Sequence, residues 1–323
     1  MSKPLTIITH SLPVSENDPV FSELKKISEI IFTKKTLAKE PKLKNATALI
    51  TFVTDPISEK LLKSGTNLKI VSNFAVGFNN IDLKAAVKRG IAVTNTPDVL
   101  TNATAEMTIA LVFAAARRMK EAVEVIQQKK FKGWTPGFLL GKELKNSTLG
   151  IVGMGRIGGA VAAKARALGM NVIGCNQMSW KEDSVFTARM GLTTFEQTLA
   201  QSDFISIHTP LNDQTFHLFN EKTFRLMKAG SLLINTSRGE VIDEKALIKA
   251  LGSEKKPGLL TGAALDVFEH EPKLNEALRK HPRVIVFPHV ASATTEARTG
   301  MAHLAMQAVI DVLTGRELKH RVN

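Results

Sequence analysis

The stretch Gly150–Gly159, which reads GIVGMGRIGG, decides the fold. Gly153, Gly155 and Gly158 fill a GxGxxG pattern, with an apolar run typical of a strand before it and an amphipathic helical pattern after it. In such a pattern one glycine makes the turn, one lets the backbone approach a pyrophosphate, and one lets helix and strand pack closely. A glycine-rich turn without a ligand is the alternative. The flanking strand and helix favour a dinucleotide site at the helix N-terminus.

Length and composition are those of a soluble globular protein. The 323 residues are enough for two domains, each with its own core. We expect a cytoplasmic protein, because the sequence starts without the apolar stretch of a signal peptide and no apolar run is long enough to span a bilayer. The single cysteine, Cys175, excludes an internal disulfide and fits a reducing compartment.

The net charge of +13 raises the alternative of nucleic-acid binding. The lysines are scattered in small groups, and no stretch interleaves them with aromatic residues. This distribution favours a basic surface that attracts anionic substrates and cofactors. We therefore expect neither a nucleic acid nor a membrane as partner.

Apolar segments alternate with helical patterns along the chain, which indicates a parallel α/β architecture. In the first part, the expected strands are Leu5–Thr9, Ala48–Val53, Leu68–Ser72 and Ile91–Thr94, and the expected helices are Ser58–Lys63 and Leu83–Arg89. Six later strands match a doubly wound dinucleotide fold; they are Leu149–Val152, Asn171–Gly174, Phe204–His208, Ser231–Asn235, Leu260–Leu265 and Val284–Phe287.

Three further segments set the domain organisation. Ala103–Lys129 shows one long helical pattern without glycine or proline, and its apolar first half suggests burial between domains or subunits. Phe131–Leu140 is expected to be a loop. The helical segment Thr294–Thr314 follows the last strand and is expected to cross back to the first domain. We predict one domain from residues 1–102 and 292–323 and a dinucleotide-binding domain from residues 103–291.

The residues after the second strand of the dinucleotide fold bear on the choice of cofactor. In such folds an Asp or Glu there accepts the ribose hydroxyls and repels a 2′-phosphate. Here no carboxylate follows the strand, which runs into Cys175, Asn176, Gln177, Met178 and Ser179. NADP is therefore favoured, but no arginine is present to clamp its phosphate, so NAD remains open. Cys175 lacks a base or metal partner and is interpreted as a packing residue.

Three side chains of complementary chemistry, Arg238, Glu271 and His289, each follow a different predicted strand. Because ligands in open α/β sheets bind beyond the carboxyl ends of the strands, we expect them to converge on one crevice. His289 can supply a proton to a carbonyl oxygen, since imidazole titrates near neutral pH, and Glu271 would favour the imidazolium. Arg238 can hold a substrate carboxylate in its fork and polarise the carbonyl.

Each of the three also fits a structural role: Arg238 in a surface ion pair, Glu271 in an ordinary turn and His289 as a packed histidine. The remaining histidines lack both placement and partners in the sequence: His10, His208, His217, His270, His281, His303 and His320. His208 lies near a strand end and is interpreted as structural. No spacing of His, Cys and carboxylates suggests a metal site, and no nucleophile motif is present.

At these residues the chain resembles the D-isomer-specific 2-hydroxyacid dehydrogenases, most closely the glyoxylate/hydroxypyruvate reductase branch. The similarity covers nearly the whole chain, through SNFAVGFNNID (Ser72–Asp82), KRGIAVTNTPDVLTNATAE (Lys88–Glu106), LGIVGMGRIG (Leu149–Gly158), INTSRGEVID (Ile234–Asp243), GAALDVFEHEP (Gly262–Pro272) and FPHVASAT (Phe287–Thr294). It implies a Rossmann-type coenzyme domain with a smaller flavodoxin-like substrate domain made from both chain ends. It also implies NAD(P)H-dependent reduction of glyoxylate or hydroxypyruvate to the D-2-hydroxy acid.

The resemblance places Arg238, Glu271 and His289 on the family's catalytic arginine, glutamate and histidine. The backbone amides that hold the substrate carboxylate match Ala75, Val76 and Gly77, with Ala75 where the family often has glycine. The implied cofactor contacts are Gly153, Met154, Gly155, Arg156, Ile157 and Gly158 at the pyrophosphate, Asn176, Gln177 and Met178 at the ribose or its 2′-phosphate, Thr236 and Ser237 along the cleft, and Asp266 at the nicotinamide amide.

In the family the Ala103–Lys129 segment and the following loop build a two-fold homodimer. Trp134 then either reaches a neighbouring subunit's site or is only an interface aromatic. A function of another class also exists in the family, since this fold serves as a nucleotide-sensing corepressor. An Arg–Glu–His set favours the enzyme, because a sensor need not keep it.

Overall fold

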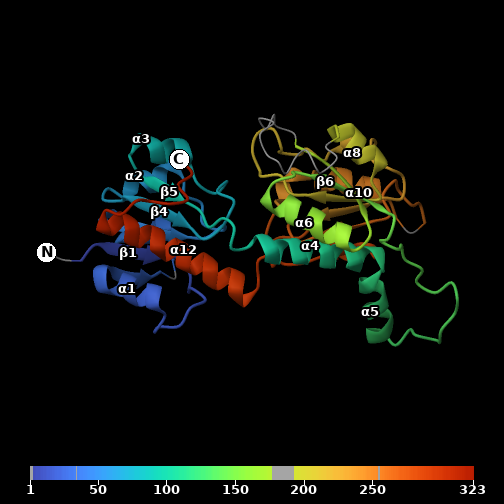
Figure 1. The fold of residues 1–323 in the computed structure, drawn as a ribbon, viewed down its shortest axis with the longest axis horizontal. Helices are drawn as coiled ribbons and strands as arrows, with labels where there is room; N and C mark the ends of the chain where they lie inside the picture. The colour runs from blue at the N-terminus through green and yellow to red at the C-terminus, as the bar shows by residue number, and fades with distance from the viewer. Residues whose placement is uncertain (1–2, 34, 177–192, 254) are drawn as a thin grey trace. The chain divides into compact units, whose positions relative to one another are not determined.

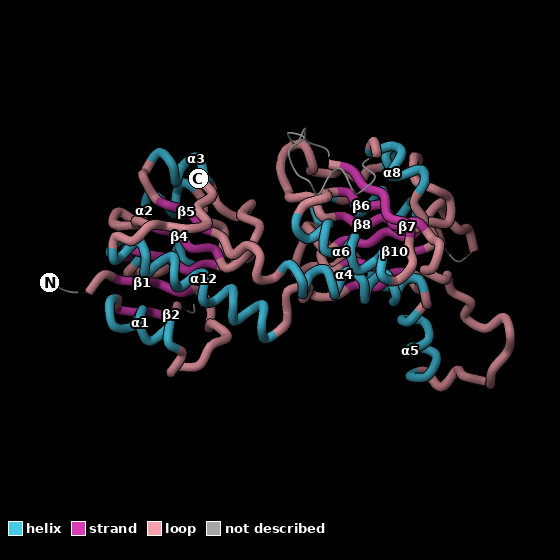
Figure 2. Tube along the Cα trace, in the orientation of Figure 1, coloured by secondary structure: helices cyan, strands magenta, loops and turns pink. Residues whose placement is uncertain are grey.

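The computed structural model describes residues 3–33, 35–176, 193–253 and 255–323 (Figure 1). The chain divides into two compact units. Unit 1 comprises Met1–Leu100 and Ala293–Asn323, and unit 2 comprises Thr101–Ser292. Each unit is built around a parallel sheet with helices packed on it (Figure 2), which confirms the predicted α/β class. No helix in the described residues is long and apolar enough to cross a membrane.

Unit 1 has a five-stranded parallel sheet of order β2-β1-β3-β4-β5, the flavodoxin-like order. Its strands are β1 (Leu5–Ile8), β2 (Glu29–Phe32), β3 (Ala46–Thr51), β4 (Ile70–Asn73) and β5 (Ala92–Thr94). The four predicted strands are present with ends shifted by a few residues. β2 is not among the predicted strands, because this edge strand has exposed ends and therefore lacks the continuous apolar run of its neighbours.

The helices of unit 1 are α1 (Pro19–Ile27), α2 (Glu59–Ser64), α3 (Leu83–Lys88) and α12 (Thr295–Thr314), with the short 3₁₀ turns η1 (Leu37–Lys39) and η2 (Leu43–Asn45). α1, also missed, begins at an Asp–Pro pair in which the Asp18 side chain accepts from the Val20 and Phe21 amides. α12 packs on α1, β3 and β4. The Ser72 hydroxyl donates to the Ala305 carbonyl (2.9 Å), which ties α12 to β4.

Unit 2 has a six-stranded parallel sheet of order β11-β10-β9-β8-β6-β7 in the described residues. The strands match the six predicted ones; they are β6 (Thr148–Val152), β7 (Asn171–Cys175), β8 (Phe204–Ile207), β9 (Leu232–Asn235), β10 (Gly262–Leu265) and β11 (Val284–Val286). The chain passes from β6 to β7 on one side and then returns to β8 on the other. The switch point, where ligands bind in such sheets, therefore lies between the carboxyl ends of β6 and β8.

Helices cover both faces of the unit 2 sheet, and its strands alternate between two cores. In β9, Leu232 and Ile234 join the cluster that includes helices α4 and α6, whereas Leu233 joins the cluster on the opposite face. The helices of unit 2 are α4 (Thr101–Ala116), α5 (Met119–Gln127), α6 (Arg156–Ala167), α8 (Phe195–Gln201), α9 (Glu221–Phe224), α10 (Glu244–Leu251) and α11 (Glu276–Lys280), with the 3₁₀ turn η3 (Gly239–Val241).

The prediction of one helix over Ala103–Lys129 is wrong, because the segment forms two helices, α4 and α5. Arg118 between them is in the left-handed conformation (φ 54°), and its guanidinium holds the Glu121 carboxylate at 2.8 and 2.6 Å. The backbone of Gly141 lies against the end of α4, where a Cβ would be 2.3 Å from the Ala116 carbonyl oxygen. The apolar surface of α4 packs on α6 and on β9–β11, so its burial is explained within unit 2.

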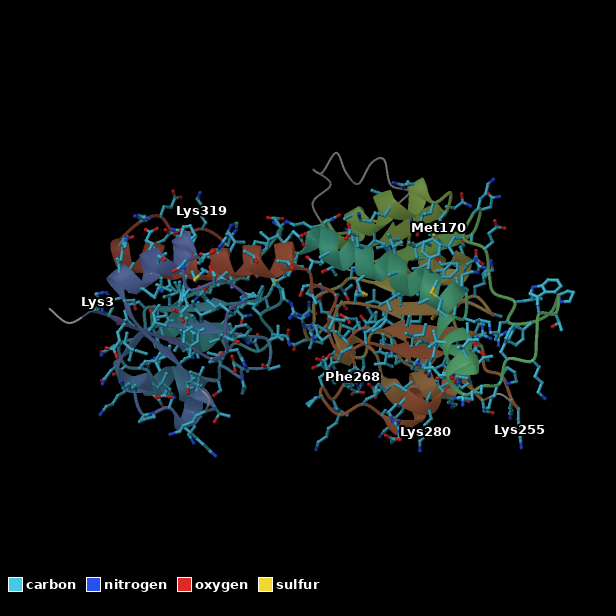
Figure 3. The ribbon with its side chains drawn as sticks, turned by 90° about the horizontal axis from the view of Figure 1, so that it is seen from below. Lys3, Met170, Lys255, Phe268, Lys280 and Lys319 are labelled. Carbon is cyan, nitrogen blue, oxygen red and sulfur yellow. The ribbon has the colours of Figure 1, made fainter. Side chains whose placement is uncertain are left out.

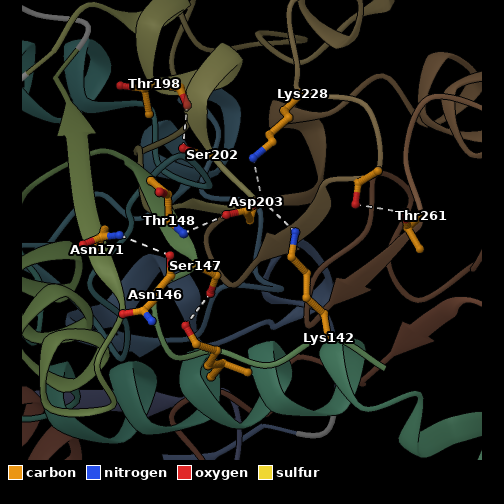
Figure 4. Close-up of polar contacts among 12 residues, drawn as sticks. Lys142, Asn146, Ser147, Thr148, Asn171, Thr198, Ser202, Asp203, Lys228 and Thr261 are labelled. Atoms are coloured by element: carbon orange, nitrogen blue, oxygen red, sulfur yellow. Dashed lines mark hydrogen bonds and ion pairs between the residues drawn. The ribbon is translucent and has the colours of Figure 1, made fainter. Parts of the chain in front are cut away.

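Asp203 ties together segments at the amino ends of the unit 2 strands (Figure 4). Its Oδ1 accepts from the ammonium groups of Lys142 (2.7 Å) and Lys228 (2.8 Å), and its Oδ2 accepts from the Thr148 amide (2.8 Å). Burial alone would raise the pKa of Asp203, but these hydrogen bonds outweigh burial and lower its pKa to about 2. The carboxylate is therefore a charged structural junction at neutral pH.

Replacing Asp203 with asparagine is expected to lower the free energy of unfolding at pH 7 by about 2 kcal/mol. The folded pKa lies below the unfolded value of 3.8, so this stability is present above about pH 4 and is lost as the pH falls towards 2. Urea unfolding of both proteins between pH 7 and pH 3 measures the difference. Glu221→Gln is the control, because its exposed ion pairs contribute less than about 1 kcal/mol. Equal losses in the two variants would contradict the prediction.

Candidate functional site

The glycine turn between β6 and α6 has two crowded glycines and one open glycine. Gly153 has a φ of 103°, and a Cβ there would lie 2.6 Å from the His208 carbonyl carbon. A Cβ at Gly158 would lie 2.3 Å from the Gly153 carbonyl oxygen. A Cβ at Gly155 would meet no described atom within 4 Å. The turn therefore needs Gly153 and Gly158 for packing. It leaves open space at Gly155, where the GxGxxG pattern predicts a pyrophosphate.

The turn lies at the switch point of the sheet, since Gly153 packs against the segment that follows β8. In this segment the His208 amide donates to the Val152 carbonyl (2.8 Å), and its Nε2 pairs with the Ser206 hydroxyl (2.8 Å). Burial lowers the pKa of His208 to about 3, so its ring is neutral at pH 7. This environment supports the structural interpretation of His208.

Asn176 follows β7 and reaches the glycine turn, where its Oδ1 accepts from the Met154 amide (2.6 Å). Met154 is buried in the core. In the first turn of α6, Arg156 is exposed and Ile157 is half-buried. The other predicted ribose contacts, Gln177 and Met178, lie outside the described residues.

Arg238 follows β9 in a turn that Asn235 shapes. The Oδ1 of this buried asparagine accepts from the amide (2.9 Å) and hydroxyl (3.0 Å) of Ser237, and its Nδ2 donates to the Arg238 carbonyl (2.8 Å). The neighbouring Thr236 hydroxyl pairs with the Thr108 hydroxyl of α4 at 2.9 Å. The backbone around Arg238 is therefore fixed by buried side chains.

The Arg238 guanidinium is a cation held in a partly buried, acidic environment. Its Nη1 donates to the Ser237 carbonyl at 2.7 Å. Burial lowers the pKa of Arg238, and the carboxylates of Glu240 and Glu271 act in the opposite direction. Arginine stays protonated at neutral pH under such shifts. The site therefore presents a permanent positive charge suited to a carboxylate or to a developing oxyanion.

His289 and Glu271 form a direct pair, with His289 Nδ1 at 2.9 Å from Glu271 Oε2. The second oxygen of Glu271 accepts from the Phe268 amide (3.2 Å), and both paired side chains are about one third exposed, at 30% and 32%. Because a carboxylate only accepts, Nδ1 carries the hydrogen of this bond. In the described part of the chain, Nε2 has no partner, so it is available to a ligand.

Asp266 is fully buried and fixes the segment that carries His289. Its Oδ1 accepts from the Val290 amide (2.8 Å), its Oδ2 from the Ala291 amide (2.7 Å), and its carbonyl from the His289 amide (2.8 Å). Burial raises the pKa of Asp266, whereas the two backbone amides lower it. The predicted contact of Asp266 with a nicotinamide amide stays a prediction.

The structure brings the three predicted catalytic side chains together within unit 2. They follow β9, β10 and β11, which are neighbours in the sheet. Glu271 bonds His289 directly and interacts electrostatically with Arg238. A cation, a carboxylate and an imidazole thus share one end of the sheet.

In unit 1, the predicted carboxylate loop Ala75–Gly77 follows β4 and presents amide donors. Its three carbonyls accept, in chain order, from the Thr96 amide, the Asn95 side chain and the Asn73 side chain, each at 2.9 Å. The amides of its second and third residues have no partner in the described residues. A backbone with bonded carbonyls and open amides is suited to an anion.

Three asparagines that shape these loops were not predicted from the sequence: Asn73, Asn95 and Asn235. Each lies at the end of an apolar strand or directly after it, in IVSN, AVTN and LLIN. A polar side chain repeated at this point of several strands was a usable signal. No group of three or more His, Cys, Asp or Glu side chains in residues 3–33, 35–176, 193–253 and 255–323 could hold a metal ion.

Comparisons with known proteins agree on one family. A sequence model of the D-isomer specific 2-hydroxyacid dehydrogenase NAD binding domain matches residues 109–291. The chain is 44% identical over 330 residues to a glyoxylate reductase of Thermococcus litoralis, covering 99% of this chain and 97% of the relative.

Two similar solved structures contain bound ligands. An NADPH-dependent glyoxylate/hydroxypyruvate reductase of Sinorhizobium meliloti, in complex with NADP and malonate, has a TM-score of 0.86 and 28% identity over 99% of this chain and 97% of that one. A D-lactate dehydrogenase of Aquifex aeolicus, complexed with NAD and lactic acid, has a TM-score of 0.83 and 30% identity over 96% of both chains.

The resemblance inferred from the motifs is thus confirmed, as are the Rossmann-type fold and the use of a nicotinamide cofactor. The chain belongs to the D-isomer specific 2-hydroxyacid dehydrogenase family and is an NAD(P)-dependent oxidoreductase.

Proposed function

We propose that the protein reduces glyoxylate or hydroxypyruvate to the corresponding 2-hydroxy acid, in the D configuration where a stereocentre forms, with NADPH or NADH as co-substrate. The His289–Glu271 pair beside the Arg238 cation carries this proposal. The glyoxylate reductase relative that spans nearly the whole chain supports the choice of a small 2-oxo acid.

The residues present fit a dinucleotide. The open space at Gly155 and the N-terminus of α6 would take the pyrophosphate, and Asn176, Thr236 and Ser237 would line the rest. A bound reduced nicotinamide supplies the hydride. We propose NADP as the preferred form, because the residue directly after β7 is Asn176 rather than a carboxylate that would repel a 2′-phosphate.

His289 acts as the general acid. Glu271 fixes the ring through Nδ1, so that Nε2 can deliver a proton to the carbonyl oxygen of the substrate as it becomes an alkoxide. Arg238 binds the substrate carboxylate and stabilises the negative charge that develops on this oxygen. In the reverse direction, neutral His289 would take the proton from the hydroxyl group.

Unit 1 is proposed as the substrate domain, with the amides of Val76 and Gly77 donating to the substrate carboxylate. Unit 2 is proposed as the coenzyme domain. The bonded carbonyls of the Ala75–Gly77 loop support this role, because they hold the amides in place before any anion arrives.

We further propose a homodimer formed through α5 and the loop Phe131–Leu140. This segment extends away from the sheet of unit 2 (Figure 1) and exposes large apolar side chains, among them Ile126 (63% exposed) and Trp134 (80%). A patch of this kind marks an interface. Analytical ultracentrifugation of the wild type and of Ile126→Lys tests this proposal, since the charge is expected to shift a dimer towards the monomer.

Gly155→Ala is expected to lose cofactor affinity, whereas Gly158→Ala is expected to lose stability. A methyl group at Gly155 meets open space, so stability should hold, while cofactor affinity should fall by at least about 10-fold, because the pyrophosphate approaches there. A methyl group at Gly158 overlaps the Gly153 carbonyl oxygen and should lower stability by about 1–3 kcal/mol. Thermal unfolding and fluorescence titration with NADPH separate the two effects. Normal cofactor affinity in Gly155→Ala would contradict the assignment.

The activity itself is tested by following NADPH and NADH absorbance with glyoxylate, hydroxypyruvate, pyruvate and 2-oxoglutarate. We expect fastest turnover with one of the first two and D-glycerate as the product of hydroxypyruvate, identified by chiral chromatography. Tight cofactor binding without turnover of any oxo acid would instead support a nucleotide-sensing protein. Formation of L-glycerate would contradict the proposed stereochemistry.

A further inference from the structure

A second histidine–carboxylate pair, His217 and Glu269, joins the segments that carry Arg238 and Glu271. The His217 amide donates to the Glu240 carbonyl at 2.9 Å, in the segment that follows Arg238. Its Nε2 bonds Glu269 Oε1 at 2.8 Å, in the segment that ends in Glu271. One residue therefore contacts the loop that carries Arg238 and the loop that carries Glu271.

The Glu269 side chain is fixed by a second set of contacts at the start of α10. Its Oε2 accepts from the Glu244 amide (3.4 Å), and its own amide donates to Glu244 Oε1 (2.8 Å). The side chains of Glu269 and His217 are 15% and 31% exposed. The pair is thus partly shielded from water, so its hydrogen bond is stronger than one at the open surface.

The two loops also touch through their backbones. A Cβ at Gly239 would lie 2.0 Å from the carbonyl carbon of Phe268, which is labelled in Figure 3. The Phe268 amide in turn donates to Glu271 Oε1. A shift of Glu269 is therefore expected to displace Phe268, which precedes it in the chain, and Glu271, which follows it. A displaced Phe268 would also change its backbone contact with Gly239 in the Arg238 loop.

The segment of His217 is itself held in place. It runs parallel to the Arg238 loop, because Phe219 bridges Ile242 and the Phe219 amide donates to the Val241 carbonyl (3.0 Å). The ring of His217 stacks on Phe216, with 4.1 Å between ring centroids. His217 has a φ of 49°, a left-handed conformation that histidine and asparagine adopt more readily than other side chains.

We propose that His217 and Glu269 are a positioning pair that sets the placement of Glu271 relative to Arg238 in the reduction of the 2-oxo acid. The inference rests on the proposed function, because it concerns the geometry of that reaction. Neither side chain bonds Arg238, Glu271 or His289 directly, so both act through the loops. The sequence alone gives no sign of this role, because Glu269 lies 52 residues from His217.

Glu269→Ala and His217→Asn are the test variants. Asparagine tolerates the left-handed backbone, so His217→Asn removes the bond to Glu269 with little strain. In both variants kcat/KM for the oxo acid is expected to fall by about 10- to 100-fold, through a lower kcat and a higher KM, since small misplacements of reacting groups cost this much. The dissociation constant for NADPH should change less than about two-fold, because the glycine turn is untouched. Glu269→Gln keeps the acceptor oxygen and should recover most of the activity.

The matched control is the pair of His303 Nε2 and Asp18 Oδ2 in unit 1, 2.7 Å apart and 38% and 12% exposed. His303→Gln should lower the melting temperature about as much as His217→Asn, without changing kcat or either KM. A crystal structure of Glu269→Ala without ligands supplies a readout other than activity, in which the Glu271–His289 hydrogen bond is expected to be lengthened or lost.

Three results would overturn the positioning pair. In the first, the wild type is active and both Glu269→Ala and His217→Asn keep kcat/KM within about two-fold of the wild-type value. This result leaves the proposed function intact. The second is a uniform loss of stability, cofactor affinity and activity, which marks a purely structural pair. The third is a wild type inactive on every oxo acid, which removes the proposed function and the inference with it. Should Glu269→Ala fail to fold, the contrast between Glu269→Gln and His217→Asn decides.

Discussion

Replacing His289 with asparagine is expected to lower kcat for reduction of the oxo acid by about 10²- to 10⁴-fold, the range typical of a lost general acid. Asparagine suits the left-handed backbone at this position (φ 55°) and cannot donate a proton to an alkoxide at neutral pH. The KM for the oxo acid should change little, because Arg238 rather than His289 is proposed to hold the carboxylate. Steady-state kinetics with NADPH and glyoxylate measures both values.

The His289 prediction has two controls. Fluorescence titration with NADPH should give the wild-type dissociation constant, and His289→Ala should match the asparagine variant in kcat but unfold at a lower temperature, because alanine is strained at a positive φ. A His289→Asn enzyme that keeps its kcat would remove the histidine from the chemistry, whatever its bond to Glu271.

The second large effect is expected from Arg238, whose replacement by alanine should lower kcat/KM for the oxo acid by about 10³-fold. Unlike the His289 variants, this enzyme should show both a higher KM and a lower kcat, since one guanidinium binds the carboxylate and stabilises the developing charge. Arg238→Lys keeps the charge and loses the fork, so it should fall between alanine and the wild type.

Added guanidinium ion at millimolar concentration should partly restore Arg238→Ala and should have no such effect on His289→Asn. Arg225→Ala is the matched control in unit 2, because Arg225 pairs with Glu221 on the surface and its side chain is 75% exposed. The assignment of Arg238 fails if Arg238→Ala retains a normal KM for glyoxylate.

Local patterns predicted most of the fold. The glycine turn at Gly150–Gly159 and the six strands of unit 2 were predictable because buried parallel strands are nearly continuous apolar runs. The edge strand Glu29–Phe32 lacks this signal. The break in the long helix could not be read from helix-breaking residues, because an ion pair between Arg118 and Glu121, rather than a glycine or proline, accompanies the change of direction.

The candidate site was predictable to the extent that it depends on positions after strands. Arg238, Glu271 and His289 follow neighbouring strands, and the sheet brings them together. The contacts that hold them were not predictable, since Asn235 acts through a buried turn and His217 through a partner distant in sequence. Such contacts depend on how loops pack, which no local pattern encodes.

The loop Ala75–Gly77 offers an anion two neutral amides whose positions are set by its own bonded carbonyls. If it binds the substrate as proposed, it does not distinguish the carboxylate of glyoxylate from that of acetate, formate or citrate. Assays in carboxylate buffers would then report an apparent KM that rises with buffer concentration, whereas amine buffers would show the enzyme's own value.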